Sequence, residues 1–197
     1  MARAGPVTKD TSTVALGLAQ IRIGASATYM GSTDLQLTAA DSIGAMASTK
    51  FISTMEIWKL ESGFPLLEDY QIPIREAASL ECAFKEITPF NLALARGYDP
   101  TGGSFPEAHT GEIALGDFDT RSIEYVRMEG IYTFPNGTNY MNIIFPRAQV
   151  VPATEMDLQA EDAVAVAVAL ESKRADSEVS GGSVVWDDKP LGWITFT

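Results

Sequence analysis

The stretch AVAVAVAL, residues 163–170, poses the main structural question of this chain. Its valines and its leucine fall on every second residue, and alanines fill the positions between them. Alanine favours helices, but large residues at a period of two favour a strand. A surface strand would carry polar side chains on its second face, whereas this one carries only methyl groups. We therefore expect a strand over 161–173 whose valine face fills an interior and whose alanine face lies under a helix or a neighbouring subunit.

The composition is that of a single acidic domain with a sizeable core. The 197 residues are 46% hydrophobic, and 14 basic residues stand against 26 acidic ones, for a formal net charge of −12. This balance argues against a protein that grips nucleic acid through a basic surface. No apolar run approaches the roughly 20 residues of a membrane helix, and no signal peptide is expected. The single cysteine, Cys82, excludes an internal disulfide and fits a reducing cytosol.

Period-two patterns predict about eight strands joined by turns. The predicted strands are 13–29, with a bulge near Gln20; 50–60; 71–86; about 121–134; 139–146; 161–173; and a last hairpin of 183–186 with 191–196. Residues 30–49 are predicted as a long loop, which could include a short strand at Leu35–Leu37. Asn136-Gly137 is a strong hairpin signal between two of them. The prolines in FPRAQVVPA (145–153) are expected to break the strand ladder twice.

One segment, TPFNLALARG (88–97), has the signals of a short helix. Thr88 is a good N-cap, Pro89 suits the first helical position, and Gly97 suits the end. A helix this short has to pack against something.

The side chains around this helix have expected structural roles. Phe90 and Leu94 are expected in the core, and Glu86 is expected to form an ion pair with Arg75 or Lys85. Together these elements predict a mainly β sandwich or barrel with one short flanking helix at about 88–97. The expected organisation is an extended N-terminal arm over 1–12, a domain over 13–176, and a C-terminal hairpin extension over 177–197 packed on the same domain.

The segment ESGFPLLEDY (61–70) concentrates apolar residues between acids. It is either a loop folded onto its own core or a protruding loop that docks on another molecule. The candidate inter-subunit residues are Phe64, Pro65, Leu66, Leu67 and Tyr70.

Signals for catalysis are weak, so we expect no catalytic residue, metal or cofactor. His109 is the only histidine, and Cys82 lies on an apolar strand face, which disfavours nucleophilic catalysis. Asp117 and Asp119 could hold a divalent cation with Glu112 or Glu124, but the remaining ligands of a known loop pattern are missing, so we interpret them as a solvated turn before a strand. The adjacent carboxylates are interpreted as turns and surface charge; these are Glu68-Asp69, Glu161-Asp162 and Asp187-Asp188.

Three segments, taken together in the order in which they follow along the chain, resemble phage tail tube (major tail) proteins. They are ALGLAQIRIGAS (15–26), IWKLESGFPLLEDYQIPIREAASLECAFKEITPFNLALARG (57–97) and NYMNIIFPRAQVVPATEMDLQAEDAVAVAVALESKRAD (139–176). The resemblance covers about residues 14–176, and it does not extend to the loop 98–117 or to the tail 177–197.

This resemblance implies a virion structural subunit made in the host cytoplasm. Such subunits assemble as stacked hexameric rings whose inner sheets join into a barrel around a channel. The implied partners are further copies of the chain, a tape-measure protein, tail-tip or baseplate proteins and a tail terminator. DNA passes through the lumen during ejection without specific binding, and no membrane is involved. An acidic lumen would repel DNA, although the acids could equally line the outside.

The sequence leaves other readings open. The nearest are another virion ring or decoration protein, such as a tail terminator or head decoration protein, and a secretion-type tube. Two other hypotheses belong to different functional classes. One is a small-molecule-binding barrel, with its pocket between helix and sheet, and the other is a metal-dependent hydrolase that uses Asp117 and Asp119.

Overall fold

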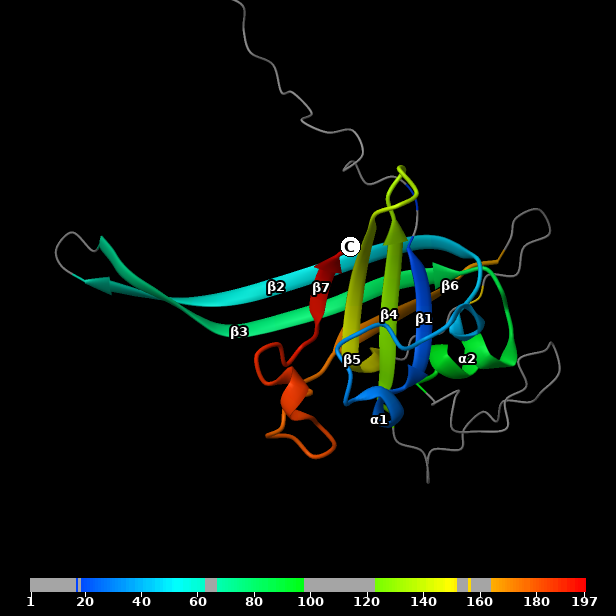
Figure 1. Ribbon diagram of the computed structural model, residues 1–197. Coiled ribbons are helices and arrows are strands. Elements are labelled where there is room, and N and C mark those ends of the chain that lie inside the picture. Colours follow the sequence, from blue (N-terminus) through cyan, green and yellow to red (C-terminus); the bar gives the residue numbers. More distant parts are fainter. Residues whose placement is uncertain (1–16, 18, 63–66, 98–122, 152–155, 157–163) are drawn as a thin grey trace, which may run out of the picture.

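The main feature of the computed structural model is one antiparallel sheet of seven strands (Figure 1). The structure describes residues 17, 19–62, 67–97, 123–151, 156 and 164–197. The strands are β1 (Gln20–Ala25), β2 (Met46–Ser62), β3 (Leu67–Phe84), β4 (Val126–Thr133), β5 (Tyr140–Val151), β6 (Val166–Ser172) and β7 (Trp193–Phe196). They lie in the order β1-β4-β5-β6-β3-β2, and β7 also pairs with β5. The prediction of a mainly β fold is confirmed.

The long strand β5 connects the two parts of the sheet. Its first half pairs with β4 and β7, and its last residues, from Ala148 onward, pair with β6. The prediction that proline breaks this strand is wrong for Pro146, which lies inside it. The β4–β5 register shifts between Val126 and Met128, opposite Pro146, so a bulge accommodates the proline without ending the ladder.

The core lies on one side of this sheet. Its fully buried members include Ile23, Phe84 and Leu170, which come from β1, β3 and β6. Helix α2 (Pro89–Ala95) adds Leu94 and Ala95 to the same cluster. The side chains of α2 therefore fill the space between the helix and the sheet. The hypothesis of a small-molecule-binding barrel had placed its pocket in this space.

Strand β6 has one covered and one open face. Val166, Val168 and Leu170 are buried, and α2 packs on their side of the sheet. The alternate residue Ala167 is exposed. Of the two covers expected for the alanines, the helix is wrong, because α2 covers the valine face, and a neighbouring subunit stays a prediction.

Three further helical turns replace predicted strands or loops. They are α1 (Ser26–Tyr29) and the 3-10 helices η2 (Ala39–Asp41) and η3 (Val184–Trp186). No strand forms at Leu35–Leu37, and β1 is shorter than predicted because it begins at Gln20. The predicted terminal hairpin is also wrong, since η3 occupies its first half and β7 pairs with β5 instead.

The C-terminal segment nevertheless packs on the same body as the sheet. Trp186 is fully buried in a second cluster with Met30, Ile144 and Ala175. The arm predicted over 1–12 lies outside the described residues. None of the helices in the described part of the chain is long and apolar enough to cross a bilayer.

Candidate assembly site

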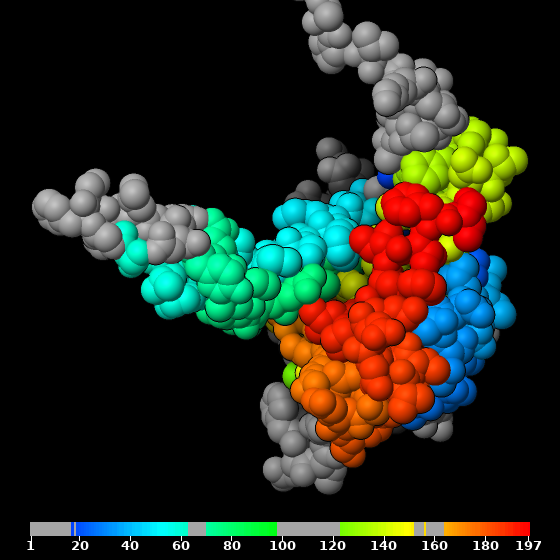
Figure 2. Space-filling model, turned by 60° about the vertical axis from the view of Figure 1, so that its left-hand side comes forward, coloured from blue at the N-terminus to red at the C-terminus, as the bar shows by residue number. Residues whose placement is uncertain are grey.

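Strands β2 and β3 extend well beyond the rest of the sheet as a two-stranded ribbon (Figures 1 and 2). Strand β6 pairs with β3 only over Ser79–Phe84. Among the strands that the structure describes, residues 53–62 and 67–78, which we call the hairpin arm, therefore pair only with each other. A two-stranded hairpin alone in water is marginally stable at best.

The hairpin arm carries large apolar side chains that its own chain leaves exposed. Trp58 is paired in register with Ile72, and Leu60 with Tyr70. Trp58 is 47% exposed and Tyr70 is 59% exposed. The other large apolar residues of the arm are also exposed: Met55, Ile57, Leu60, Ile72 and Ile74. Burying one such side chain fully is worth about 1.5–3 kcal/mol, so this surface favours association with another molecule.

The predicted docking loop 61–70 is in large part strand. Residues 61–62 end β2 and residues 67–70 begin β3, which leaves 63–66 to connect them. Phe64, Pro65 and Leu66 lie outside the described residues. Leu67 is the first residue of β3, and Tyr70 is an exposed residue of the arm.

The exposure of most of the arm's apolar residues was not predicted from the sequence. The alternation around Trp58 and Ile72 resembles that of a strand with one buried face. Exposure of that face depends on how far β6 extends along β3, which local sequence does not encode.

The second face of β6 forms an open surface together with β3, β2 and the end of β5. Ala167 is aligned with Ala83, and Ala169 with Glu81 and Val151. These strands line an open hollow of about 410 Å³. We call this surface the alanine face; its hollow is lined on this side of the sheet by Ser48, Lys50, Glu81, Ala83, Val151, Ala167 and Ala169.

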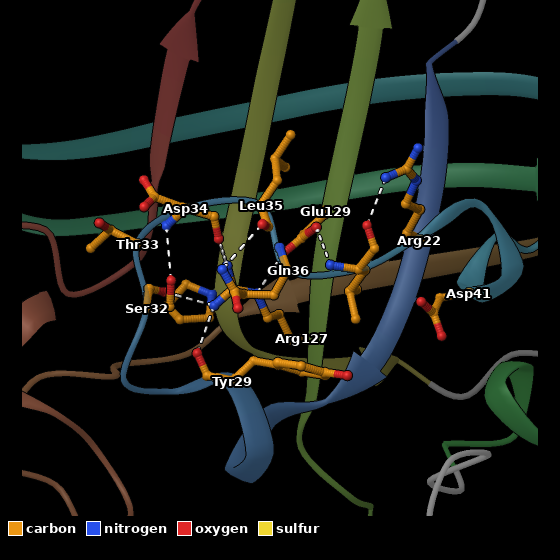
Figure 3. Close-up of polar contacts among 12 residues, drawn as sticks. Arg22, Tyr29, Ser32, Thr33, Asp34, Leu35, Gln36, Asp41, Arg127 and Glu129 are labelled. Atoms are coloured by element: carbon orange, nitrogen blue, oxygen red, sulfur yellow. Dashed lines mark hydrogen bonds and ion pairs between the residues drawn. The ribbon is translucent and has the colours of Figure 1, made fainter.

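A buried ion pair fastens the segment 29–37 onto β4 (Figure 3). Arg127 and Glu129 are both fully buried, and Arg127 Nε lies 2.7 Å from Glu129 Oε1. The guanidinium also donates to the carbonyl oxygens of Tyr29, Ser32 and Asp34. The carboxylate accepts from the backbone N–H groups of residues 36 and 37.

Two tryptophans hold the same segment from the C-terminal side. Trp186 Nε1 donates to the Met30 carbonyl at 2.7 Å, and Trp193 Nε1 donates to the Thr33 carbonyl at 3.2 Å. Lys189 Nζ lies 3.6 Å from the Trp193 ring centroid. The segment 29–37 is thus fixed by β4 and by the C-terminal segment together, although neither set of contacts is signalled by local sequence.

The helix α2 is capped as the sequence predicts. Thr88 Oγ1 accepts from Asn91 N at 3.1 Å, and Pro89 is the first helical residue. Leu94 is fully buried in the core and Phe90 is partly buried against it. The helix residues are thus structural.

The predicted ion pair of Glu86 is not formed. Within the described residues Glu86 pairs with neither Arg75 nor Lys85, and its carboxylate accepts from Ala45 N at 2.8 Å. Arg75 lies far along β3, where its cross-strand partner is Glu56. Because Arg75 belongs to the arm, it is separated from the start of the helix.

The described residues contain few side chains placed to bind a metal ion or to act as a nucleophile. They contain no group of three acidic, histidine or cysteine side chains placed to hold a metal ion. Asp117, Asp119, Glu112 and His109 lie outside the described residues, and Glu124 is exposed. Burial raises the pKa of the Cys82 thiol to about 12, which keeps it protonated and unreactive at neutral pH.

No family model and no curated protein sequence matches the chain. Among solved structures, the chain is similar to one in the sheath/tube terminator of the PVC extracellular contractile injection system in its extended state. That similarity has a TM-score of 0.47 at 11% identity, covering 100% of this chain and 99% of the other. A chain of the PVC sheath-tube complex aligns with a TM-score of 0.45 at 10% identity, covering 98% and 99%. A chain in the tail of the empty gene transfer agent particle aligns with a TM-score of 0.42 at 14% identity, covering 91% and 95%.

Proposed function

We propose that this protein is a non-enzymatic structural subunit of a phage or phage-like tail tube. In this proposal it assembles as stacked hexameric rings around a channel that conducts DNA during ejection. The rings lie in the virion tail, where they contact a tape-measure protein, tail-tip or baseplate proteins and a terminator. The sequence resemblance over about residues 14–176 suggests this role, and the hairpin arm supports it.

The hairpin arm is the observation that carries the proposal. It is a ribbon with exposed apolar side chains and, along the outer side of β2, a strand edge of 17 residues that pairs with no other strand of the described residues. Long open edges of this kind pair with other chains unless something blunts them. An arm that contacts a different surface on the next copy makes a heterologous contact, which generates rings or open-ended stacks.

The first test compares the assembly of the wild type with that of an arm variant. Trp58→Glu combined with Ile72→Lys replaces one apolar cross-strand pair of the arm by an opposite-charge pair, which preserves the hairpin and places two charges within its apolar surface. The matched control is Val184→Glu with Val185→Lys on η3, whose parent side chains are 71% and 38% exposed. Size-exclusion chromatography and negative-stain microscopy at high concentration, with and without tail-tip components, measure the outcome.

We expect the wild type and the η3 control to form rings or tubes with a central hole. The arm variant should stay dissociated while its melting temperature in dilute solution remains unchanged. An arm variant that polymerises like the wild type would refute the role given to the arm. A wild type that forms only single rings would instead indicate a terminator, and one that never assembles would indicate a decoration protein.

The segment between β2 and β3 is our second candidate contact, placed between rings. As part of the proposal, Phe64, Leu66 and Leu67 dock on the next ring. The N-terminal residues 1–12 add a strand to the sheet edge of a neighbouring subunit. Charge substitutions at all three apolar residues should abolish stacking while single rings still form. Tubes of normal length from that triple variant would exclude the ring-to-ring contact.

A further inference from the structure

We infer that Asn136, at the tip of the β4–β5 hairpin, is a site of spontaneous deamidation and that the folded turn around it restrains the reaction. This chemistry does not depend on the assembly proposed above. Asn136 is exposed and is followed by Gly137, whose missing side chain leaves the next backbone nitrogen open to the asparagine amide. The other asparagines of the chain precede Leu92, Tyr140 and Ile143, whose larger side chains hinder the same approach.

The reaction is an attack of a peptide nitrogen on a side-chain amide. The Gly137 nitrogen loses its proton and forms a bond to Asn136 Cγ. The amide nitrogen Nδ2 takes up that proton and leaves as ammonia, which closes a succinimide ring. Water, the only co-reactant, then opens the ring at either of its carbonyl carbons and gives aspartate or isoaspartate.

The folded turn occupies the attacking nitrogen. Gly137 N donates to the Phe134 carbonyl oxygen at 2.9 Å, so residues 134–137 form a β-turn with Pro135 and Asn136 at its centre. Gly137 follows in the left-handed region with φ of +71°, and the ring of Pro135 fixes the backbone at the first central position. The Gly137 nitrogen can attack only after it gives up this hydrogen bond and its proton, so the turn has to open first.

The side-chain amide is held by the same turn. Asn136 Oδ1 accepts from Thr138 N at 3.1 Å and from Asn139 N at 3.0 Å. Two such donors would stabilise the negative charge that develops on Oδ1 during attack, as an oxyanion hole does. An opening that frees the Gly137 nitrogen also removes the alignment of these donors, so the folded turn cannot supply both at once. The folded state is therefore the slower one.

The product disturbs more than the turn, because isoaspartate adds a methylene group to the main chain. The turn adjoins the end of the chain at the hairpin tip, which projects beyond one end of the sheet (Figure 1). Tyr140 and Thr197 exchange backbone hydrogen bonds of 2.8 and 3.0 Å, and the rings of Phe134 and Phe196 stack with their centroids 6.4 Å apart. Modification of Asn136 should therefore weaken the pairing of β7 with β5.

Peptide mass spectrometry that resolves aspartate from isoaspartate tests this inference. The full chain is incubated in dilute solution at mildly alkaline pH, once folded and once in urea. The variant Pro135→Ala is treated in the same two ways. It keeps the Asn-Gly dipeptide, and therefore the intrinsic chemistry, while it removes the residue that presets the turn. Asn139, which lies in the same hairpin but precedes Tyr140, is the internal control.

We expect the folded wild type to react at Asn136 at least about tenfold more slowly than the chain in urea, which corresponds to a local opening free energy of about 1.4 kcal/mol. Folded Pro135→Ala should react about two- to fivefold faster than the folded wild type, because its turn opens more often. In urea the two chains should react at the same rate, and Asn139 should stay unmodified throughout.

Three results would overturn the inference. Equal rates in the folded and unfolded wild type would show that the turn gives no restraint, and a faster reaction in the folded protein would show that the donors on Asn136 Oδ1 activate the amide instead. Equal folded rates for the wild type and Pro135→Ala would show that the turn does not control the reaction. Modification of Asn139 in place of Asn136 would show that the site is assigned to the wrong residue.

Discussion

Strands β4 and β6 each have a second face that points away from the core, and the chain treats the two faces in opposite ways. On β4 the second face carries Arg127 and Glu129, fully buried under the segment 29–37. On β6 it carries Ala167 and Ala169, and nothing in the described part of the chain covers them as it covers β4.

This difference distinguishes contacts that stabilise the fold of one subunit from surfaces that remain free for assembly. The β4 face is closed within a single chain, because Arg127 donates hydrogen bonds to carbonyl groups of one backbone segment and Glu129 accepts hydrogen bonds from N–H groups of the same segment. The alanine face and the arm are left open along the opposite part of the sheet. Substitutions on β4 should therefore act on stability, and substitutions on the open surfaces should act on assembly.

The largest expected effect is the loss of one member of the buried pair. Arg127→Met leaves the Glu129 carboxylate buried without its cation and removes the donors to residues 29, 32 and 34. Breaking a buried pair in this way costs about 3–5 kcal/mol of unfolding free energy. Urea unfolding of dissociated subunits measures it.

The matched control for this prediction removes both charges. Arg127→Met with Glu129→Leu should be more stable than Arg127→Met alone, because no uncompensated buried charge remains. Equal stability of the single and double variants would show that the segment 29–37, rather than the ion pair, dominates the energetics.

The two faces of β6 give the next largest contrast. Leu170→Ala empties part of the core and should cost about 2–5 kcal/mol. Ala169→Ser, one residue away on the open face, should change the stability of the dissociated subunit by no more than about 0.5 kcal/mol. A large destabilisation by Ala169→Ser would mean that the alanine face is covered within one chain. Thermal unfolding at low protein concentration compares the two.

The elements that sequence predicted best are those whose signals are local. The α2 helix follows from Thr88 and Pro89, which supply the cap and the first turn. The strand character of 71–84 follows from its alternation, and the same pattern correctly separates Leu80 and Cys82 from Glu81.

The features that sequence missed depend on distant partners. Arg127 and Glu129 look like the polar side of a surface strand, yet they are buried because the segment 29–37 lies over them. Pro146 looks like a strand breaker, yet a bulge in β5, where residues 146 and 147 lie opposite Arg127 of β4, accommodates it. Trp186 looked like a strand residue, and its burial against Met30 accompanies a 3-10 turn instead.

A smaller effect is expected at the cap of the helix that covers the valine face of β6. Thr88→Ala removes the acceptor for Asn91 N and should cost about 1 kcal/mol of unfolding free energy. Thr88→Ser retains a hydroxyl acceptor and serves as the control, so it should unfold close to the wild type. If both variants were equally destabilised, the threonine methyl group rather than the hydrogen bond would be responsible. Either result should leave assembly intact, since the helix lies on the covered side of the sheet.

The smallest expected effect is at the C-terminal segment that holds the segment 29–37, and it depends on pH. Hydrogen bonds from the Ser177 backbone N–H, at 2.8 Å, and from its hydroxyl lower the pKa of Asp187 below its ordinary value. A lowered carboxyl pKa stabilises the folded state above the unfolded-state pKa, and this contribution disappears as the pH falls through the folded-state pKa. Asp187→Asn should therefore reduce stability at neutral pH and flatten its decline in acid, whereas Ser177→Ala, which keeps the backbone donor, should do so only in part. Melting temperatures measured from neutral to acidic pH would contradict this if both variants retained the wild-type slope, because the carboxylate would then contribute nothing to closing the covered side of the molecule.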